Sequence, residues 1–182
     1  MKIIGISGYA RAGKDTFAAY AAEILEEFGL QSKRIAFADS LKKNINSFLL
    51  EHLGIGSFTQ DDDAKLIIRP LLVAYGAAAR KINKDYWIEQ IKPDILNSDK
   101  TVVKIITDVR YENECKFIQS LGGKIIVVSQ PSSAPANDEE KRNQPFVDDI
   151  ANHKLIWPKF GASNMGAAKK YVNESLKELG II

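Results

Sequence analysis

The chain has 182 residues, 45% of them hydrophobic, and a formal net charge of +2 at pH 7. This length and composition predict one domain with a packed core, and the near-neutral charge argues against a polybasic surface for nucleic acid or a membrane. The single cysteine, Cys115, excludes an internal disulfide framework and a multi-cysteine zinc site. The N-terminal residues lack the pattern of a secretory signal, and no stretch approaches about 20 apolar residues, so we expect a soluble, cytoplasmic protein.

Strand and helix patterns alternate along the chain. Short β-branched runs indicate buried strands, and apolar residues three and four apart indicate helices. In chain order, the predicted elements are a strand at residues 2–7, a helix at 14–28, a strand at 33–38, helices at about 40–53, 61–80 and 85–96, a strand at 101–107, a helix at 111–121, a strand at 124–129, a short strand at 153–157 and a helix at 167–179. This alternation predicts an α/β fold with three layers, in which a parallel sheet of about five strands carries helices on both faces. Ligands of such sheets bind at the carboxyl ends of the strands.

Polar residues and a proline mark the limits of several predicted helices. Asp39 or Ser40 is expected to cap the helix that follows the second strand. The three aspartates at residues 61–63 are expected to open the next helix, because acidic side chains favour its positive N-terminal end. A metal site there is the less favoured interpretation. Pro70 predicts a kink or a new first turn.

Residues 130–145, QPSSAPANDEEKRNQP, interrupt the alternation. They are rich in proline, serine and charge and have no apolar periodicity, which is typical of a mobile surface loop. A lid over residues 130–147 is the other interpretation. In that case Lys141 and Arg142 would close over phosphates and exclude water. The composition does not decide between the two.

Residues 8–16, GYARAGKDT, lie between the first predicted strand and the first predicted helix. Gly8 and Gly13 allow backbone N–H groups to approach phosphate oxygens at a helix N-terminus, and Lys14 can reach the terminal phosphates. A tight turn with an exposed lysine is the simpler alternative, but the spacing, the strand before and the helix after all favour a phosphate-binding loop. The residues expected to bind the nucleotide are Gly8, Arg11, Ala12, Gly13, Lys14, Asp15 and Thr16, with Arg142 from the lid.

Asp15 stands where the common phosphate loop carries serine or threonine. We expect it to meet Mg²⁺ directly or through water, although an acidic residue is also common in the first turn of a helix. The pattern Gly-Lys-x-Thr, with Thr16 last, is typical of small-molecule kinases rather than of switch-type GTPases. Residues 83–86, NKDY, lack the final aspartate of a guanine-reading signature and precede a helix, so we reject that interpretation.

A kinase must also hold a second substrate, and an anionic one needs its own cations. Asp39 and Lys42 follow the second predicted strand, Arg69 lies among apolar residues, and Asp108 and Arg110 follow the third strand. Asp108 can order Mg²⁺ and water or orient the acceptor, and Arg110 can clamp a phosphate with two hydrogen bonds. The alternative for this last pair is a salt bridge that ties a loop. Asp15 and Asp108 are therefore the candidate metal ligands, and Lys14, Arg69, Asp108 and Arg110 are the candidate catalytic residues.

Four segments, GYARAGKDT, FADSLKK, RPLLVAYGAAARKINKDYWIEQI and TDVRYENECKFIQSLGGKIIVVSQP, resemble the deoxynucleoside monophosphate kinases of the bacteriophage type. They occur in the same order, from Lys2 to about Pro131. The resemblance implies a P-loop kinase fold in a single domain over residues 1–182, with a helical acceptor-binding region at about 39–98. It also implies transfer of the γ-phosphate of ATP to a deoxynucleoside monophosphate with Mg²⁺.

By this resemblance, residues 8–16 would bind ATP. The side chains around the acceptor would be those of Lys42, Arg69, Asp108 and Arg110. Trp87 would line or support the same pocket, although a tryptophan on a helix is more often part of a core. The expected partners are small-molecule nucleotides, and the resemblance leaves a homodimer open.

Two other functions stay open. Phosphomevalonate and dephospho-coenzyme A kinases share this kind of fold, and the first can also carry Gly-Lys-Asp and Asp-x-Arg motifs. A regulatory module that binds ATP without transferring phosphate would need the loop but no second cationic pocket. His52 and His153 lie near apolar residues without a matched nucleophile, and Cys115 suits a helix interior, so we expect all three to serve in packing.

Overall fold

The computed structural model describes residues 1–97, 99–131, 133–160 and 165–182. These residues form two compact units, one of residues 1–35 and 97–182 and the other of residues 36–96. We call them the sheet unit and the helical unit. The predicted ranges 39–98 and 130–147 each contain one residue, Ser98 and Ser132, that lies outside the described residues.

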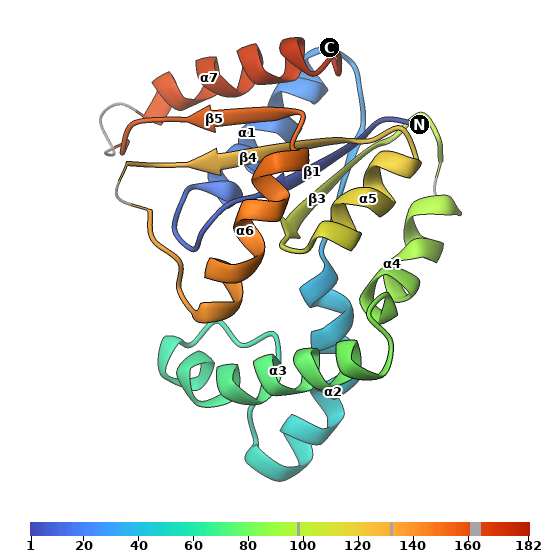
Figure 1. Ribbon diagram of the computed structural model, residues 1–182, viewed down its shortest axis with the longest axis vertical. Helices are drawn as coiled ribbons and strands as arrows, with labels where there is room; N and C mark the ends of the chain where they lie inside the picture. The colour runs from blue at the N-terminus through green and yellow to red at the C-terminus, as the bar shows by residue number, and fades with distance from the viewer. Residues whose placement is uncertain (98, 132, 161–164) are drawn as a thin grey trace. The chain divides into compact units, whose positions relative to one another are not determined.

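The sheet unit is built on five parallel strands in the order β2-β3-β1-β4-β5. The strands are β1 (Ile3–Ser7), β2 (Ser32–Ile35), β3 (Val103–Val109), β4 (Lys124–Ser129) and β5 (His153–Ile156) (Figure 1). Every residue of β1 is buried, as expected of a central strand whose two faces are both covered. The predicted parallel sheet of about five strands is confirmed.

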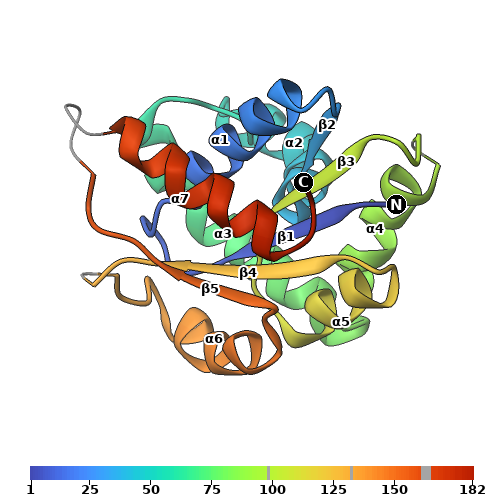
Figure 2. The ribbon, with the colours of Figure 1, turned by 90° about the horizontal axis from the view of Figure 1, so that it is seen from above.

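Helices cover both faces of this sheet. The helices of the sheet unit are α1 (Lys14–Glu27), α5 (Glu112–Ser120), α6 (Asp138–Ile150) and α7 (Met165–Glu178). Helices α1 and α7 lie on one face and α5 and α6 on the other (Figure 2). The core between α1, α7 and the strands contains Phe17, Leu25, Ile126, Val172 and Trp157. The three-layer arrangement predicted from the alternation is therefore confirmed.

The helical unit consists of α2 (Phe37–Leu53), α3 (Asp62–Ile82) and α4 (Tyr86–Leu96). The side chain of Asp61 caps α3 by accepting a hydrogen bond of 2.7 Å from the Ala64 N–H, so the prediction that these aspartates open a helix is confirmed. Helix α3 continues through Pro70, and the prediction of a new first turn there is wrong. No helix in the described part of the chain is long and apolar enough to cross a membrane.

Two predicted boundaries around the second and third strands are wrong. Strand β2 ends at Ile35 and α2 begins at Phe37, with Ala36 rather than Asp39 or Ser40 at its N-cap. Both Ala36 and Phe37 are buried, and the Asp39 N–H donates to the Ala36 carbonyl, so the chain turns into the helix before the polar residues begin. Strand β3 continues to Val109, which places Asp108 inside the strand rather than after it.

The prediction of a loop at residues 130–145 is also wrong, because residues 138–150 form helix α6. The Asn137 side chain caps it by accepting a hydrogen bond of 2.8 Å from the Glu140 N–H, and the first turn is acidic. Its buried residues are Glu140, Gln144 and Val147. Because two of these three are polar, the helix shows no apolar periodicity in the sequence.

Candidate active site

The phosphate loop connects β1 to α1 through backbone conformations that require glycine. Gly8 has φ of 137°, and a Cβ atom there would lie 2.0 Å from the Val128 carbonyl oxygen. Gly13 has φ of 92° and forms the N-cap of α1. Only a residue without a side chain fits at Gly8. The loop therefore brings its backbone to the N-terminus of α1, where N–H groups can meet an anion.

Trp157, which follows β5 directly, supports this loop from the core. Its indole N–H donates a hydrogen bond of 2.9 Å to the Ala12 carbonyl. A Cβ atom at Gly13 would lie 2.5 Å from Cζ2 of the Trp157 ring. The rings of Phe17 and Phe160 pack against the same indole, with centroids 6.3 Å and 5.4 Å away. Trp157 thus holds the middle of the loop against the hydrophobic core.

The Lys14 ammonium group folds back onto its own loop. Nζ donates hydrogen bonds of 2.8 Å to the carbonyls of Gly8 and Tyr9. Burial lowers the pKa of Lys14, and the positive charge of Arg110 lowers it further, while nearby carboxylates, first that of Glu140, act in the opposite direction. The lysine therefore lies among charges of both signs in a partly desolvated position.

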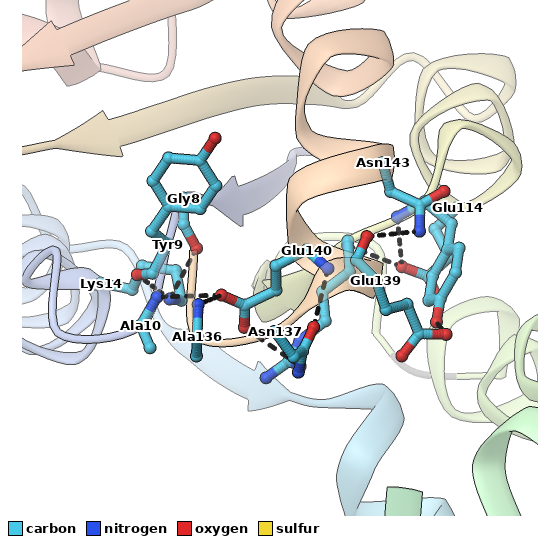
Figure 3. A network of polar contacts seen from close by, with 12 residues as sticks. Gly8, Tyr9, Ala10, Lys14, Glu114, Ala136, Asn137, Glu139, Glu140 and Asn143 are labelled. Carbon is cyan, nitrogen blue, oxygen red and sulfur yellow. Dashed lines mark hydrogen bonds and ion pairs between the residues drawn. The ribbon is translucent and has the colours of Figure 1, made fainter. Parts of the chain in front are cut away.

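Arg110 and Glu140 form an ion pair beside the loop, with 3.4 Å between Nη1 and Oε1. The other carboxylate oxygen of Glu140 accepts hydrogen bonds from the backbone N–H groups of Ala136, at 3.0 Å, and Ala10, at 3.4 Å. Figure 3 shows the Glu140 carboxylate pointing toward the backbones of Ala10 in the loop and Ala136. The sequence predicted Arg110 at this position, but not its partner Glu140.

A second buried carboxylate fixes the backbone that carries Arg110. Oε2 of Glu114 accepts hydrogen bonds from the N–H groups of Arg110, at 2.8 Å, and Tyr111, at 3.2 Å. The Tyr111 hydroxyl in turn donates to Glu139 on α6. Each of these contacts joins the turn after β3 to a helix, so the position of the Arg110 backbone is well defined.

The hydroxyl of Ser7 is fully buried at the end of β1 and has no hydrogen-bond partner within the described residues. A buried polar group without a partner is costly, and such groups are uncommon. Ser7 directly precedes Gly8, so this donor lies where the loop begins.

The remaining predicted site residues of the sheet unit lie on its helices. Asp15 is exposed and Thr16 partly buried in the first turn of α1. Arg142 is exposed on α6, and its Nε donates to the Asp138 carbonyl of the same helix at 3.3 Å. Asp108 and Asp15 both act on the charge of Lys14. The structure therefore brings Lys14, Asp15, Asp108 and Arg110 into one electrostatic neighbourhood.

The other predicted acceptor residues belong to the helical unit. Asp39 lies in the first turn of α2, and Nζ of Lys42 lies 5.5 Å from the centre of the Phe58 ring. Arg69 is exposed on α3. Trp87 is buried, its indole N–H donates to the Gly76 carbonyl at 3.2 Å, and it packs against Tyr75 and Tyr86. Trp87 is therefore part of the core of the helical unit.

Within the described residues, no group of three or more His, Cys, Asp or Glu side chains could hold a metal ion. This includes the aspartates at residues 61–63, of which Asp62 pairs with Lys65 at 3.0 Å. The described residues therefore form no metal site made of protein ligands alone. Mg²⁺ in kinases usually binds through one or two carboxylates together with substrate phosphates and water, and Asp15 and Asp108 fit that smaller requirement.

His153 has the contacts of a hydrolase triad, but a substrate could not reach the serine. Its Nδ1 lies 3.0 Å from a Glu178 carboxylate oxygen and its Nε2 lies 3.2 Å from the Ser175 hydroxyl. That hydroxyl is buried and donates to the Tyr171 carbonyl of its own helix. These contacts tie β5 to α7 and agree with the packing role expected for this histidine.

A parallel sheet with a phosphate loop between its first strand and first helix is the fold of the P-loop kinases. The chain is similar to a crystal structure of shikimate kinase from Bacteroides thetaiotaomicron, with a TM-score of 0.52, 12% sequence identity and coverage of 96% of this chain and 98% of that chain. At this identity the similarity concerns the fold alone.

Sequence comparison identifies the family within that class. The model of the deoxynucleotide monophosphate kinase family matches residues 29–144, and the chain belongs to this family. It is 28% identical over 186 residues to a protein of Acanthamoeba polyphaga mimivirus named "Putative deoxynucleotide monophosphate kinase", covering 86% of this chain and 91% of that protein. It is 27% identical over 183 residues to an uncharacterized protein of Ictalurid herpesvirus 1 (strain Auburn), covering 98% of this chain and 68% of that protein.

The family match and the phosphate loop are separate observations. The match begins at residue 29, after the loop, and runs beyond Pro131 to residue 144. It therefore includes Arg69, Arg110 and the part of α6 that carries Glu140. The family predicted from the sequence is confirmed, and a nucleoside monophosphate kinase-like activity is what this membership supports.

Proposed function

We propose that the chain transfers the γ-phosphate of ATP to a deoxynucleoside monophosphate and releases ADP and the deoxynucleoside diphosphate. The observation that carries this proposal is the phosphate loop, with Lys14, Asp108 near the end of β3 and Arg110 just after it at the same end of the sheet, in a chain of the deoxynucleotide monophosphate kinase family. A phosphoryl transfer of this kind needs positioning and charge rather than a covalent intermediate.

ATP binding is assigned to residues 8–16. The loop N–H groups and the N-terminus of α1 would surround the phosphates of ATP, and Thr16 would contact a phosphate nearer the nucleoside. On binding, Lys14 would exchange its two carbonyl partners, on Gly8 and Tyr9, for phosphate oxygens. The exchange is favourable because a charged donor binds more strongly to an anionic acceptor than to a neutral one.

Transfer of the γ-phosphate spreads negative charge over its oxygens, and Lys14 and Arg110 would stabilise that charge. Asp15 and Asp108 would hold Mg²⁺ directly or through water, and the bound ion would supply further positive charge for the phosphates of ATP. Asp108 would also orient the attacking oxygen of the acceptor.

By the resemblance of the sequence, Arg110, Lys42 and Arg69 would contact the acceptor phosphate. Asp39 would contact the same nucleotide, and Trp87, which is buried in the core of the helical unit, would support the acceptor-binding side chains of that unit. Residues 130–147, which include most of α6, are the proposed lid, with Arg142 reaching the phosphates of ATP. Within the described residues, the exposed guanidinium of Arg142 has one contact, a hydrogen bond of 3.3 Å to the Asp138 carbonyl.

The first experiment is ADP release from ATP and Mg²⁺ in the presence of dAMP, dCMP, dGMP, dTMP or their ribose forms. Phosphomevalonate and dephospho-coenzyme A are tested in parallel. We expect turnover with at least one deoxynucleotide, and the set of active nucleotides gives the base and sugar preference. Turnover with phosphomevalonate or dephospho-coenzyme A alone would leave the assignment of ATP to residues 8–16 intact but show that the acceptor is not a nucleoside monophosphate.

Two arginine variants separate a kinase from a regulatory ATP-binding module. Arg69→Ala and Arg110→Ala should leave the Kd for ATP within about twofold of the wild type and lower kcat/KM by at least about 100-fold, since each would remove a charged contact to the acceptor. Lys43→Ala, an exposed residue of α2, is the matched control. An equal loss of ATP affinity would contradict the assignment of these arginines to the acceptor.

A further inference from the structure

Glu140 is a buried carboxylate at which three separate segments meet. It lies on α6 and is 8% exposed. Its contacts reach Ala10 of the phosphate loop, Arg110 after β3, and Ala136 before α6 (Figure 3). A charged side chain is rarely buried without a partner, and here each oxygen of the carboxylate has at least one. We propose that Glu140 is a positioning residue that orients the Arg110 guanidinium for the acceptor phosphate and ties it to the phosphate loop.

The geometry of arginine explains why such a residue is useful. A guanidinium group is a planar fork, and it binds phosphate best through two parallel N–H groups on one edge. Glu140 contacts Nη1 at 3.4 Å, and the Arg110 side chain as a whole stays 48% exposed. The contact restrains the guanidinium at Nη1, and the exposed part of the side chain leaves other N–H groups for a ligand. Holding the fork in place before binding reduces the entropy lost when the acceptor phosphate docks.

Charge gives Glu140 a second reason to lie here. Lys14 and Arg110 are close enough for the charge of Arg110 to lower the pKa of Lys14, and Glu140 is the first of the carboxylates that raise it. Two cations near each other would repel in the absence of substrate. In the ligand-free protein, the Glu140 carboxylate offsets this repulsion between the two cations.

The same carboxylate could instead compete with phosphate for Arg110 and the loop. The contacts favour positioning. The shortest contact of the Glu140 carboxylate is the 3.0 Å hydrogen bond from the N–H of Ala136, two residues before its own helix. Its contact with the loop N–H of Ala10 is longer, at 3.4 Å. The carboxylate is thus anchored beside the loop rather than seated in it.

The test is Glu140→Gln, which keeps the size of the side chain and one acceptor oxygen for the N–H groups of Ala136 and Ala10, but removes the charge that attracts Arg110 and replaces the other oxygen by an NH2 group. We expect the KM for the acceptor nucleotide to rise about tenfold, which corresponds to one charge-assisted hydrogen bond. The KM for ATP should change less than about twofold. Asp138→Asn, at an exposed position in the first turn of the same helix, removes an equal charge without contacting Arg110 and should leave both constants unchanged.

A double-mutant cycle then shows whether Glu140 acts through Arg110. In an Arg110→Ala background, Glu140→Gln should have no further effect on the acceptor KM. Glu140→Asp keeps the charge on a shorter stem and should give an intermediate acceptor KM. This second variant also keeps the test decisive if Glu140→Gln lowers the thermal unfolding temperature.

Three results would overturn the inference. An unchanged acceptor KM would show that the ion pair is not used, and a lower one would show that the carboxylate competes with phosphate. An equal rise in both KM values would show a structural role for the loop as a whole. The inference rests on the proposed function, so wild-type silence with every deoxynucleotide rejects both, whereas wild-type turnover with an unchanged acceptor KM in Glu140→Gln rejects the inference alone.

Discussion

In the sheet unit, the two side chains that contact the phosphate loop from α6 and from the end of β5 are almost completely buried. Trp157 is 1% exposed, and Glu140, which also pairs with Arg110, is 8% exposed. In the helical unit, Arg69 is exposed on α3, and so are the apolar side chains of Leu66, at 67%, and Ile67, at 58%, whereas Ile68 is buried. The loop is therefore held by contacts of the same kind that hold a core. Arg69, in contrast, lies on a surface that the folding of the helical unit does not bury.

This contrast has a consequence for mutations. A substitution beneath the phosphate loop should change stability and nucleotide binding together, because the same contacts serve both. A substitution on the exposed face of α3 should change the activity with little effect on stability, since surface substitutions usually cost less than about 0.5 kcal/mol. The predictions below test this coupling, beginning with the largest expected effect.

Lys14→Met should lower kcat/KM by about 1,000-fold or more, because it removes a positive charge from the transferring phosphate. Its stability should fall by about 1 kcal/mol, since the carbonyls of Gly8 and Tyr9 lose the donor that Lys14 supplies. Steady-state kinetics and thermal unfolding measure the two quantities. Lys170→Met, on the exposed side of α7, should leave both unchanged. If Lys14→Met retains more than about a tenth of the activity, Lys14 has no catalytic role.

Gly8→Ala should lower the free energy of unfolding by about 3 kcal/mol or more and abolish ATP binding. The new Cβ atom would clash with the Val128 carbonyl at 2.0 Å in a backbone conformation that disfavours side chains. Gly54→Ala is the counterpart in the helical unit, because Gly54 has φ of 64° but no atom within 4 Å of its Cβ position among the described residues. It should cost about 1 kcal/mol and spare ATP binding. Denaturant unfolding and ATP titration check both variants, and similar losses in the two would contradict the proposed difference.

Trp157→Phe and Trp87→Phe make the same chemical change in the two units. Each removes an indole N–H from a buried carbonyl, that of Ala12 in the first case and that of Gly76 in the second. Each should therefore lower the free energy of unfolding by about 2 kcal/mol. Only Trp157→Phe should also weaken ATP binding, by about fivefold, because its carbonyl partner belongs to the phosphate loop. Isothermal titration with ATP decides the point, and equal ATP affinities would show that the loop does not need this hydrogen bond.

The affinity for ATP should fall as the pH rises, and the fall should begin at a lower pH than the deprotonation of an ordinary lysine would give. Burial and the charge of Arg110 lower the pKa of Lys14 in the free protein, so the ammonium loses its proton at a lower pH than usual. Phosphate binding requires that proton. As the pH rises through this lowered pKa, binding weakens, and a plot of log Kd against pH should bend below the ordinary range of lysine. In Lys14→Met the bend should disappear, and its persistence would assign it to another group.

Most of the fold could be predicted from local patterns. Short β-branched runs correspond to the buried strands β1, β3 and β4, and Gly29, with φ of 71°, follows the end of α1 where the spacing predicted a stop. The phosphate loop could be recognised because its chemistry depends on glycine and lysine at fixed spacing between one strand and one helix. The predicted cap at Asp39 or Ser40 was wrong, since burial of Ala36 and Phe37 decided where α2 begins. Helix α6 was missed because it buries Glu140 and Gln144, which do not look apolar.

The sequence by itself therefore determined the order of most elements, the family and the position of the glycine-rich loop, because each of these depends on neighbours along the chain. Only the tertiary structure decided which side chains hold those residues in place. The Trp157 hydrogen bond to Ala12 spans 145 positions of the sequence, and the contact of Glu140 with Ala10 spans 130. No local pattern encodes such pairs. They form because the parallel sheet brings the end of β5 beside the phosphate loop, and α6 packs against the sheet so that Glu140 reaches the same loop.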